Sequence, residues 1–230
     1  MILFFMHLFS KMFHIKEDVS EANRENNRKF HVPTTGDGYI DWQEQMKSFR
    51  YGKQSDFLSD LLLGGEPLNA SINGCGLIAV YNVLAYYGIK RSFSDIVYDF
   101  EKNGASLFGY FGSSFNRIAG YIKKEGLQVS DVPVSYAKGD TVRFQTGERV
   151  SYIITGLNEK GRIRSMVHTI ALTCEGNLLR AHNDVTGGRL YSSLAEAVYD
   201  FGNGKGAVLK VIMIRGKEDE QDRDSNLQLQ

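Results

Sequence analysis

Cys75 has the residue type and the setting of a catalytic nucleophile. It stands in the sequence Asn73-Gly74-Cys75-Gly76, at the first turn of a segment whose apolar spacing predicts a buried helix over residues 76–87. The positive end of a helix dipole lowers the pKa of a thiol, and backbone N–H groups at a helix start can bind a developing oxyanion. The flanking glycines allow a substrate backbone to approach closely. The competing interpretation is a buried, inert cysteine, which is the common state of this residue in protein cores.

A thiolate nucleophile needs a base, and the base needs a group that orients it. His168 stands near the start of a segment whose period of two predicts a strand, and Gly176-Asn177 predicts a hairpin turn after it. Counting outward from that turn places one of three polar residues level with His168: His182, Asn183 or Asp184. An acid or amide there can hold one imidazole nitrogen and leave the other for the thiol. Taken singly, His168 also fits a half-buried strand histidine, and Asp184 fits an ordinary turn residue.

Two kinds of element must position these residues. Helical spacing predicts helices over residues 76–87, 95–103 and 114–126, with Ser94 as the N-cap of the second and Ser114 at the start of the third. After Gly126 the period changes to two, which predicts strands over residues 127–134, 150–157, 167–176, 177–182 and 206–215, with one helix over 192–201. Helices followed by strands predict an α+β domain, in which an N-terminal helical layer packs on a mostly antiparallel sheet.

Composition excludes several classes of protein. The chain of 230 residues balances 27 lysines and arginines against 27 acids, so no basic surplus indicates a nucleic-acid partner. A hydrophobic fraction of 42% supports a folded core, and two cysteines exclude a disulfide scaffold and a four-cysteine zinc site. No pair of His or Cys residues has metal-ligand spacing, and no cofactor is expected.

The ends of the chain differ in composition from its middle. The apolar start is too short for a membrane span and lacks the flanks of a secretory signal, which favours a cytoplasmic protein unless this start is a signal remnant. Residues 16–29 are polar and predict a solvated helix or linker. The expected organisation is a partly flexible N-terminal extension over 1–38, one domain over 39–215 and a disordered tail over 216–230.

The segment NASINGCGLIAVYNVLAYYG, residues 69–88, resembles the nucleophile segment of the papain-like peptidases that remove double-glycine leader peptides from bacteriocins. The 16 residues from His168 to Asp184 are similar to the spacing in that family, and the order Cys, His, Asp is the same. The resemblance implies a papain-like fold and a cysteine peptidase with a peptide or protein substrate. It implies that Cys75 is the nucleophile, His168 the base and Asp184 the orienting residue. Without an ATPase signature, the chain resembles the stand-alone form of the family.

One position departs from the family pattern. Papain-like enzymes carry a glutamine six residues before the cysteine as an oxyanion donor, and this chain has Asn69 there. Asparagine offers the same amide on a stem that is one methylene shorter, so either Asn69 or Asn73 is expected to fill this role. The departure also leaves open a catalytically silent domain that binds peptides or acts as an accessory protein. An acyl or amide transferase on the same scaffold is a further alternative.

The histidine segment has a second resemblance. HTIALTCEGNLLRAHN, residues 168–183, is similar to the corresponding segment of NlpC-type cell-wall endopeptidases, in which a second histidine follows on the return strand. His182 would take that role here. The cysteine segment of those enzymes usually reads Asp-Cys-Ser, which NGCGLI does not match, so Asp184 is preferred to His182 as the orienting residue.

Overall fold

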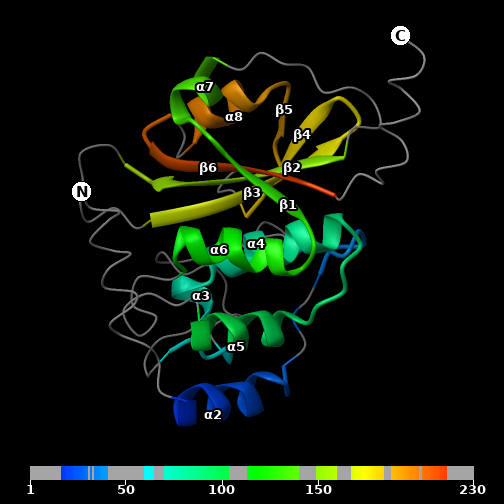
Figure 1. Cartoon of the computed structure of the whole chain (residues 1–230), viewed down its shortest axis with the longest axis vertical. Coiled ribbons are helices and arrows are strands. Elements are labelled where there is room, and N and C mark those ends of the chain that lie inside the picture. Colours follow the sequence, from blue (N-terminus) through cyan, green and yellow to red (C-terminus); the bar gives the residue numbers. More distant parts are fainter. Residues whose placement is uncertain are drawn as a thin grey trace.

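The computed structural model describes residues 17–30, 32, 34–40, 60–64, 70–103, 113–139, 149–159, 167–183, 188–201 and 204–216. A six-stranded sheet lies between two groups of helices (Figure 1). Helices α4 and α6 lie against one face, with α5 and then α2 beyond them, and α7 and α8 lie on the other face. This architecture confirms the predicted α+β class with a helical layer on an antiparallel sheet.

Every strand pair in the described sheet is antiparallel. The strands are β1 (Gln128–Val132), β2 (Val150–Leu157), β3 (Val167–Glu175), β4 (Leu178–His182), β5 (Leu190–Tyr191) and β6 (Ala207–Arg215), in the spatial order β1-β6-β2-β3-β4-β5. Strands β3 and β4 form the predicted hairpin, and Gly176 in its turn has φ +65°. Glycine adopts such a positive φ at little cost, which is why the turn falls where the sequence predicts it.

The described helices are α2 (Glu17–Asn27), α3 (Ala70–Asn73), α4 (Cys75–Tyr86), α5 (Phe93–Asn103), α6 (Phe115–Lys124), α7 (Val134–Gly139) and α8 (Leu194–Asp200). Ser92 caps α5 in place of the predicted Ser94, because the Ser92 hydroxyl accepts from the Asp95 N–H at 3.1 Å. The strand expected over 127–134 ends at Val132, and the short helix α7, which the sequence does not predict, follows Pro133. Within the described ranges, no helix has the length and apolar character needed to cross a membrane.

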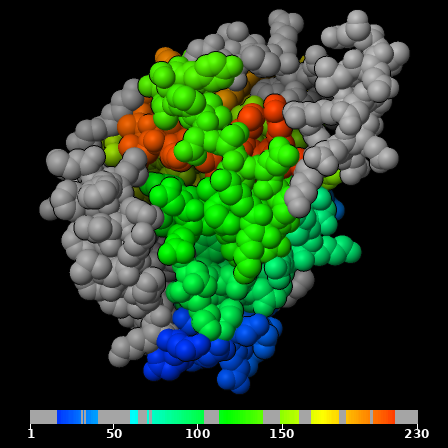
Figure 2. Space-filling model, viewed as in Figure 1, coloured from blue at the N-terminus to red at the C-terminus, as the bar shows by residue number. Residues whose placement is uncertain are grey.

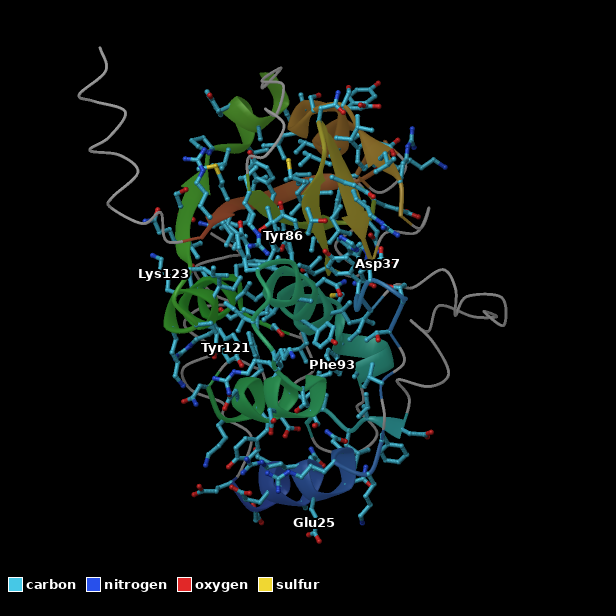
Figure 3. The ribbon with its side chains drawn as sticks, turned by 90° about the vertical axis from the view of Figure 1, so that its right-hand side faces the viewer. Glu25, Asp37, Tyr86, Phe93, Tyr121 and Lys123 are labelled. Carbon is cyan, nitrogen blue, oxygen red and sulfur yellow. The ribbon has the colours of Figure 1, made fainter. Side chains whose placement is uncertain are left out.

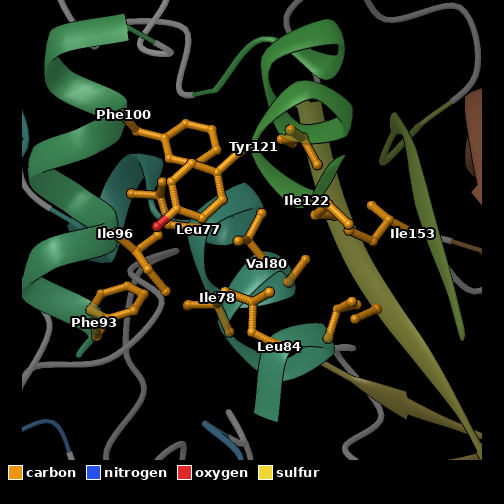
Figure 4. Close-up of a cluster of buried hydrophobic side chains, with 14 of the residues drawn as sticks. Leu77, Ile78, Val80, Leu84, Phe93, Ile96, Phe100, Tyr121, Ile122 and Ile153 are labelled. Carbon is orange, nitrogen blue, oxygen red and sulfur yellow. The ribbon is translucent and has the colours of Figure 1, made fainter. Parts of the chain in front are cut away.

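The two faces of β3 pack into different cores. Ala171 faces the core that contains α4, and Ile170 faces the core that contains α8. In the first core, Leu77, Val80 and Leu84 of α4 meet side chains from α5, α6 and β2 (Figure 4). Burying each such side chain stabilises the fold by about 1.5–3 kcal/mol. Helix α4 is therefore held firmly against the sheet, and this fixes the position of its first residue.

Helix α2 is joined to the body by amide side chains instead of apolar ones, at the lower end of the molecule (Figures 1 and 2). Its buried residues are all polar: Ser20, Asn23 and Asn27. The Asn27 side chain pairs with Leu62 as a strand would, donating to its carbonyl and accepting from its N–H, both at 2.9 Å. Glu25 on the opposite face points away from the body (Figure 3). The sequence predicts a solvated helix or linker here; the structure has the helix but buries one of its faces.

Glu101 of α5 is a buried carboxyl group in the contact with α2. Its side chain is 1% exposed, and Oε1 accepts from Asn23 Nδ2 at 2.6 Å and from the Gly64 N–H at 2.8 Å. Oε2 has no hydrogen-bond partner, and no ion pair among the described residues includes Glu101. Burial raises the pKa of this carboxyl group to about 7, although the two hydrogen bonds act in the opposite direction.

We expect Glu101 to make the free energy of unfolding fall as the pH rises. Its pKa is raised from 4.5 to about 7 by folding, so the folded protein binds the proton more tightly across that interval. The loss should be about 3 kcal/mol and complete just above pH 7. Glu101→Gln keeps a neutral side chain and should remove this component, as urea unfolding at about pH 5 and about pH 8 would measure. An identical pH dependence in both proteins would show that the pKa of Glu101 is the same in the folded and the unfolded protein, and would contradict this expectation.

Candidate active site

Cys75 is the first residue of α4, at a tight junction with α3. Gly74 makes this junction possible, since a Cβ there would lie 2.2 Å from the Ala70 carbonyl oxygen. A Cβ on Gly76 would lie 3.1 Å from the Ile118 side chain. The sequence predicts that these glycines admit substrate backbone. In the structure they allow α3 and α6 to pack closely against the start of α4.

The thiol of Cys75 lies beside the start of β3. Its Sγ is 3.9 Å from the carbonyl oxygen of Val167, the residue before His168. The side chain is 9% exposed, so the sulfur is nearly enclosed. The helix dipole of α4 places partial positive charge at this end, which favours the thiolate. The fold therefore brings together the thiol and the segment that carries the expected base.

His168 is held in one orientation by the main chain of Asn183. The imidazole is 6% exposed, and its Nε2 lies 2.8 Å from the Asn183 carbonyl oxygen. A carbonyl oxygen can only accept, so Nε2 carries the proton, and the lone pair of the neutral ring is on Nδ1. The tautomer of a histidine is set by the partner of one nitrogen, and this partner leaves Nδ1 as the basic atom.

Asn183 connects the two halves of the site. It follows β4 with φ +61°, the left-handed region that asparagine adopts more readily than other residues with side chains. Its Nδ2 donates to the Thr169 carbonyl at 3.2 Å and to the Cys75 carbonyl at 3.5 Å, while its own carbonyl holds His168. The residue is fully buried, and its Oδ1 has no hydrogen-bond partner. One residue therefore links the helix start, the base and strand β3.

His182 does not lie level with His168, which corrects the predicted register. It is opposite Ala171 in the β3–β4 pair, so it shares the face of Ala171 and not that of His168. Its Nε2 bonds the Thr173 hydroxyl at 2.7 Å, and its ring lies 4.4 Å from that of Tyr39. Burial, with a smaller contribution from a nearby arginine, lowers the pKa of His182 to about 3. His182 is a neutral core residue with a partner of its own.

Asn69 and Asp184 fall outside the described residues, and their expected roles stay predictions. Asn73 is buried in α3, two residues before the nucleophile. Cys174 lies near the far end of β3, about 20 Å along the strand from His168. Neither Cys75 nor Cys174 forms a disulfide bond.

The sequence matches no family model, and it matches no curated protein. The resemblance to papain-like peptidases therefore rests on the motifs, and the chemistry of the site rests on its geometry. Sequence reasoning considered the side chain of Asn183 and missed its main-chain carbonyl. A signal was present, because asparagine at the end of a strand is a candidate for a positive φ, which turns the carbonyl out of the strand ladder.

Proposed function

We propose that this protein is a papain-like cysteine hydrolase, and specifically a peptidase that forms a thioester on Cys75. One observation carries the proposal. His168, the residue after the carbonyl that Cys75 Sγ contacts, donates its Nε2–H to the Asn183 carbonyl. This leaves Nδ1 as the basic atom, which is the tautomer that a general base needs. The position of the thiol at a helix start is the second support, since it favours the thiolate.

The proposed reaction has two halves. His168 Nδ1 takes the proton of the Cys75 thiol, and the thiolate attacks the carbonyl carbon of the scissile peptide bond. The tetrahedral intermediate collapses, the C–N bond breaks, and the leaving amine takes the proton from His168. A water molecule then attacks the thioester while His168 accepts its proton, and the acid product leaves as the thiolate is restored. Backbone N–H groups near the start of α4, with the amide of Asn69 or Asn73, are the proposed oxyanion donors.

A second candidate function is a silent domain that binds peptides without cleaving them. The observation that favours it is the small exposure of Cys75, 9%, together with the contact of its Sγ with a main-chain carbonyl. A buried thiol that can donate its S–H to a carbonyl oxygen is stabilised in its neutral form. The two candidates differ in the reactivity of this thiol.

We expect iodoacetamide to label Cys75 faster than Cys174 at about pH 6, by about 10-fold or more, because a helix start, and in the proposed mechanism the imidazole of His168, lower the pKa of the Cys75 thiol. Labelling each single-cysteine variant, Cys174→Ser and Cys75→Ser, and counting adducts by mass spectrometry measures the two rates separately. Cys174 is the more exposed of the two, so accessibility alone predicts the reverse order. Preferential labelling of Cys174 would favour the silent domain.

A further inference from the structure

The ring of Phe201 lies beside His168, on the face of the sheet covered by α8. Phe201 follows the last residue of α8 and is 4% exposed. The centroids of the two rings are 6.4 Å apart, and their planes are tilted by 33°. The ring thus borders the imidazole that the proposed mechanism uses, although it comes from a different element and carries no polar group.

Two glycines shape the seat of this ring. Gly156 of β2 is directly opposite His168 in the β2–β3 register, and a Cβ there would lie 2.8 Å from Phe201 Cε1. Gly206 precedes β6, and a Cβ there would lie 2.7 Å from Phe201 Cδ1. A side chain at either position would collide with the Phe201 ring and, at 2.5–2.6 Å, with a main-chain carbonyl oxygen of Ala207 or Phe201, so the ring lies close against the backbone of both glycines.

The backbone next to the Phe201 ring is irregular. The register between β2 and β6 shifts at Thr155/Gly156, and the Gly206 N–H donates to the Phe201 carbonyl at 3.2 Å. Such a register shift re-aims the chain locally, and such irregularities are common next to functional sites. The main chain of Phe201 is therefore held by Gly206, and its ring packs beside Gly156 of β2.

We propose that Phe201 is a positioning residue for His168. Its ring, seated between Gly156 and Gly206, limits rotation of the imidazole and keeps water from the bond between His168 Nε2 and the Asn183 carbonyl. A hydrogen bond is stronger where water cannot compete for it, and a packed side chain stays in one rotamer. This inference rests on the proposed function, because it gives Phe201 a role only through the base.

The test compares Phe201→Leu with Phe100→Leu. Phe100 is as deeply buried, at 2% exposed, but it packs against Tyr121 in the other core. Both variants should lower the melting temperature by a similar amount, since both lose a buried ring. Only Phe201→Leu should lower the rate of Cys75 alkylation at about pH 6, by about 10-fold, and move the rise of the alkylation profile to higher pH. Phe201→Met, which nearly conserves volume, supplies a milder variant if Phe201→Leu fails to fold.

A second readout does not depend on catalysis. Nitrogen-15 spectra of the His168 ring should show a single Nε2–H tautomer in the parent protein and in Phe100→Leu. A mixture of tautomers, or faster exchange of that proton, is expected in Phe201→Leu and in Phe201→Met. An unchanged tautomer in both Phe201 variants would overturn the proposal. If Cys75 of the parent protein is no more reactive than Cys174 while the tautomer shift is seen, the proposed function fails and the positioning role stands.

Discussion

Replacing His168 with alanine is expected to lower the rate of Cys75 alkylation at about pH 6 by about 100-fold. Without the imidazole, the thiol pKa should return toward about 8.5, where only about 0.3% is thiolate at that pH. In the proposed mechanism, the imidazole takes the thiol proton, and its positive charge then stabilises the thiolate together with the dipole of α4. The measurement is the second-order rate of iodoacetamide labelling between about pH 4 and about pH 9, in a Cys174→Ser background.

His182→Ala is the matched control for this experiment. His182 is also a buried strand histidine, but its Nε2 bonds Thr173, and it shares the face of Ala171. Its loss should lower the melting temperature and leave the pH profile of Cys75 alkylation in place. If His182→Ala abolishes the reactive thiolate and His168→Ala does not, the Cys-His-His arrangement of the NlpC-type enzymes replaces the one proposed here.

Substitution of Asn183 should separate the roles of its main chain and its side chain. Asn183→Gly keeps access to φ +61°, and with it the carbonyl that holds His168, but it removes the bonds to Thr169 and Cys75. It should cost about 1–3 kcal/mol of stability and keep the low-pH reactivity of Cys75. Asn183→Ala should cost about 1–2 kcal/mol more, because alanine pays for the left-handed backbone.

Urea unfolding of the two variants, together with their alkylation profiles, checks both expectations. If Asn183→Gly loses the low-pH reactivity as completely as His168→Ala, the side chain of Asn183 orients the base. Asp184→Ala is the companion variant, since Asp184 is the orienting residue that the family resemblance implies. Loss of reactivity in Asp184→Ala, with Asn183→Gly unaffected, would assign the orienting role to Asp184 instead of the Asn183 carbonyl.

The sequence by itself determined the features that depend on local patterns. The apolar spacing before Gly88 predicts α4, and with it a cysteine at a helix start. Alternation along residues 167–175 predicts β3 and places Ile170 and Ala171 on opposite faces of the strand, which the structure packs into different cores. Gly176 marks the hairpin turn, since a positive φ is cheap for glycine. Each of these signals is contained in a short stretch of sequence, so it can be recognised without knowing which distant residues pack against it.

Only the tertiary structure decided how the site is joined. Asn183 leaves the strand with a positive φ, which points its carbonyl at His168, and no period in the sequence shows where a strand will bend. The register of the β3–β4 pair decided that His182 faces away from His168, because a shift of one residue exchanges the faces of a strand. The ring of Phe201 lies beside His168 because it packs against Gly156 of β2 and Gly206, which have no side chains to displace it. Each of these facts depends on how separate elements bend, pair or pack, which the local sequence pattern does not encode.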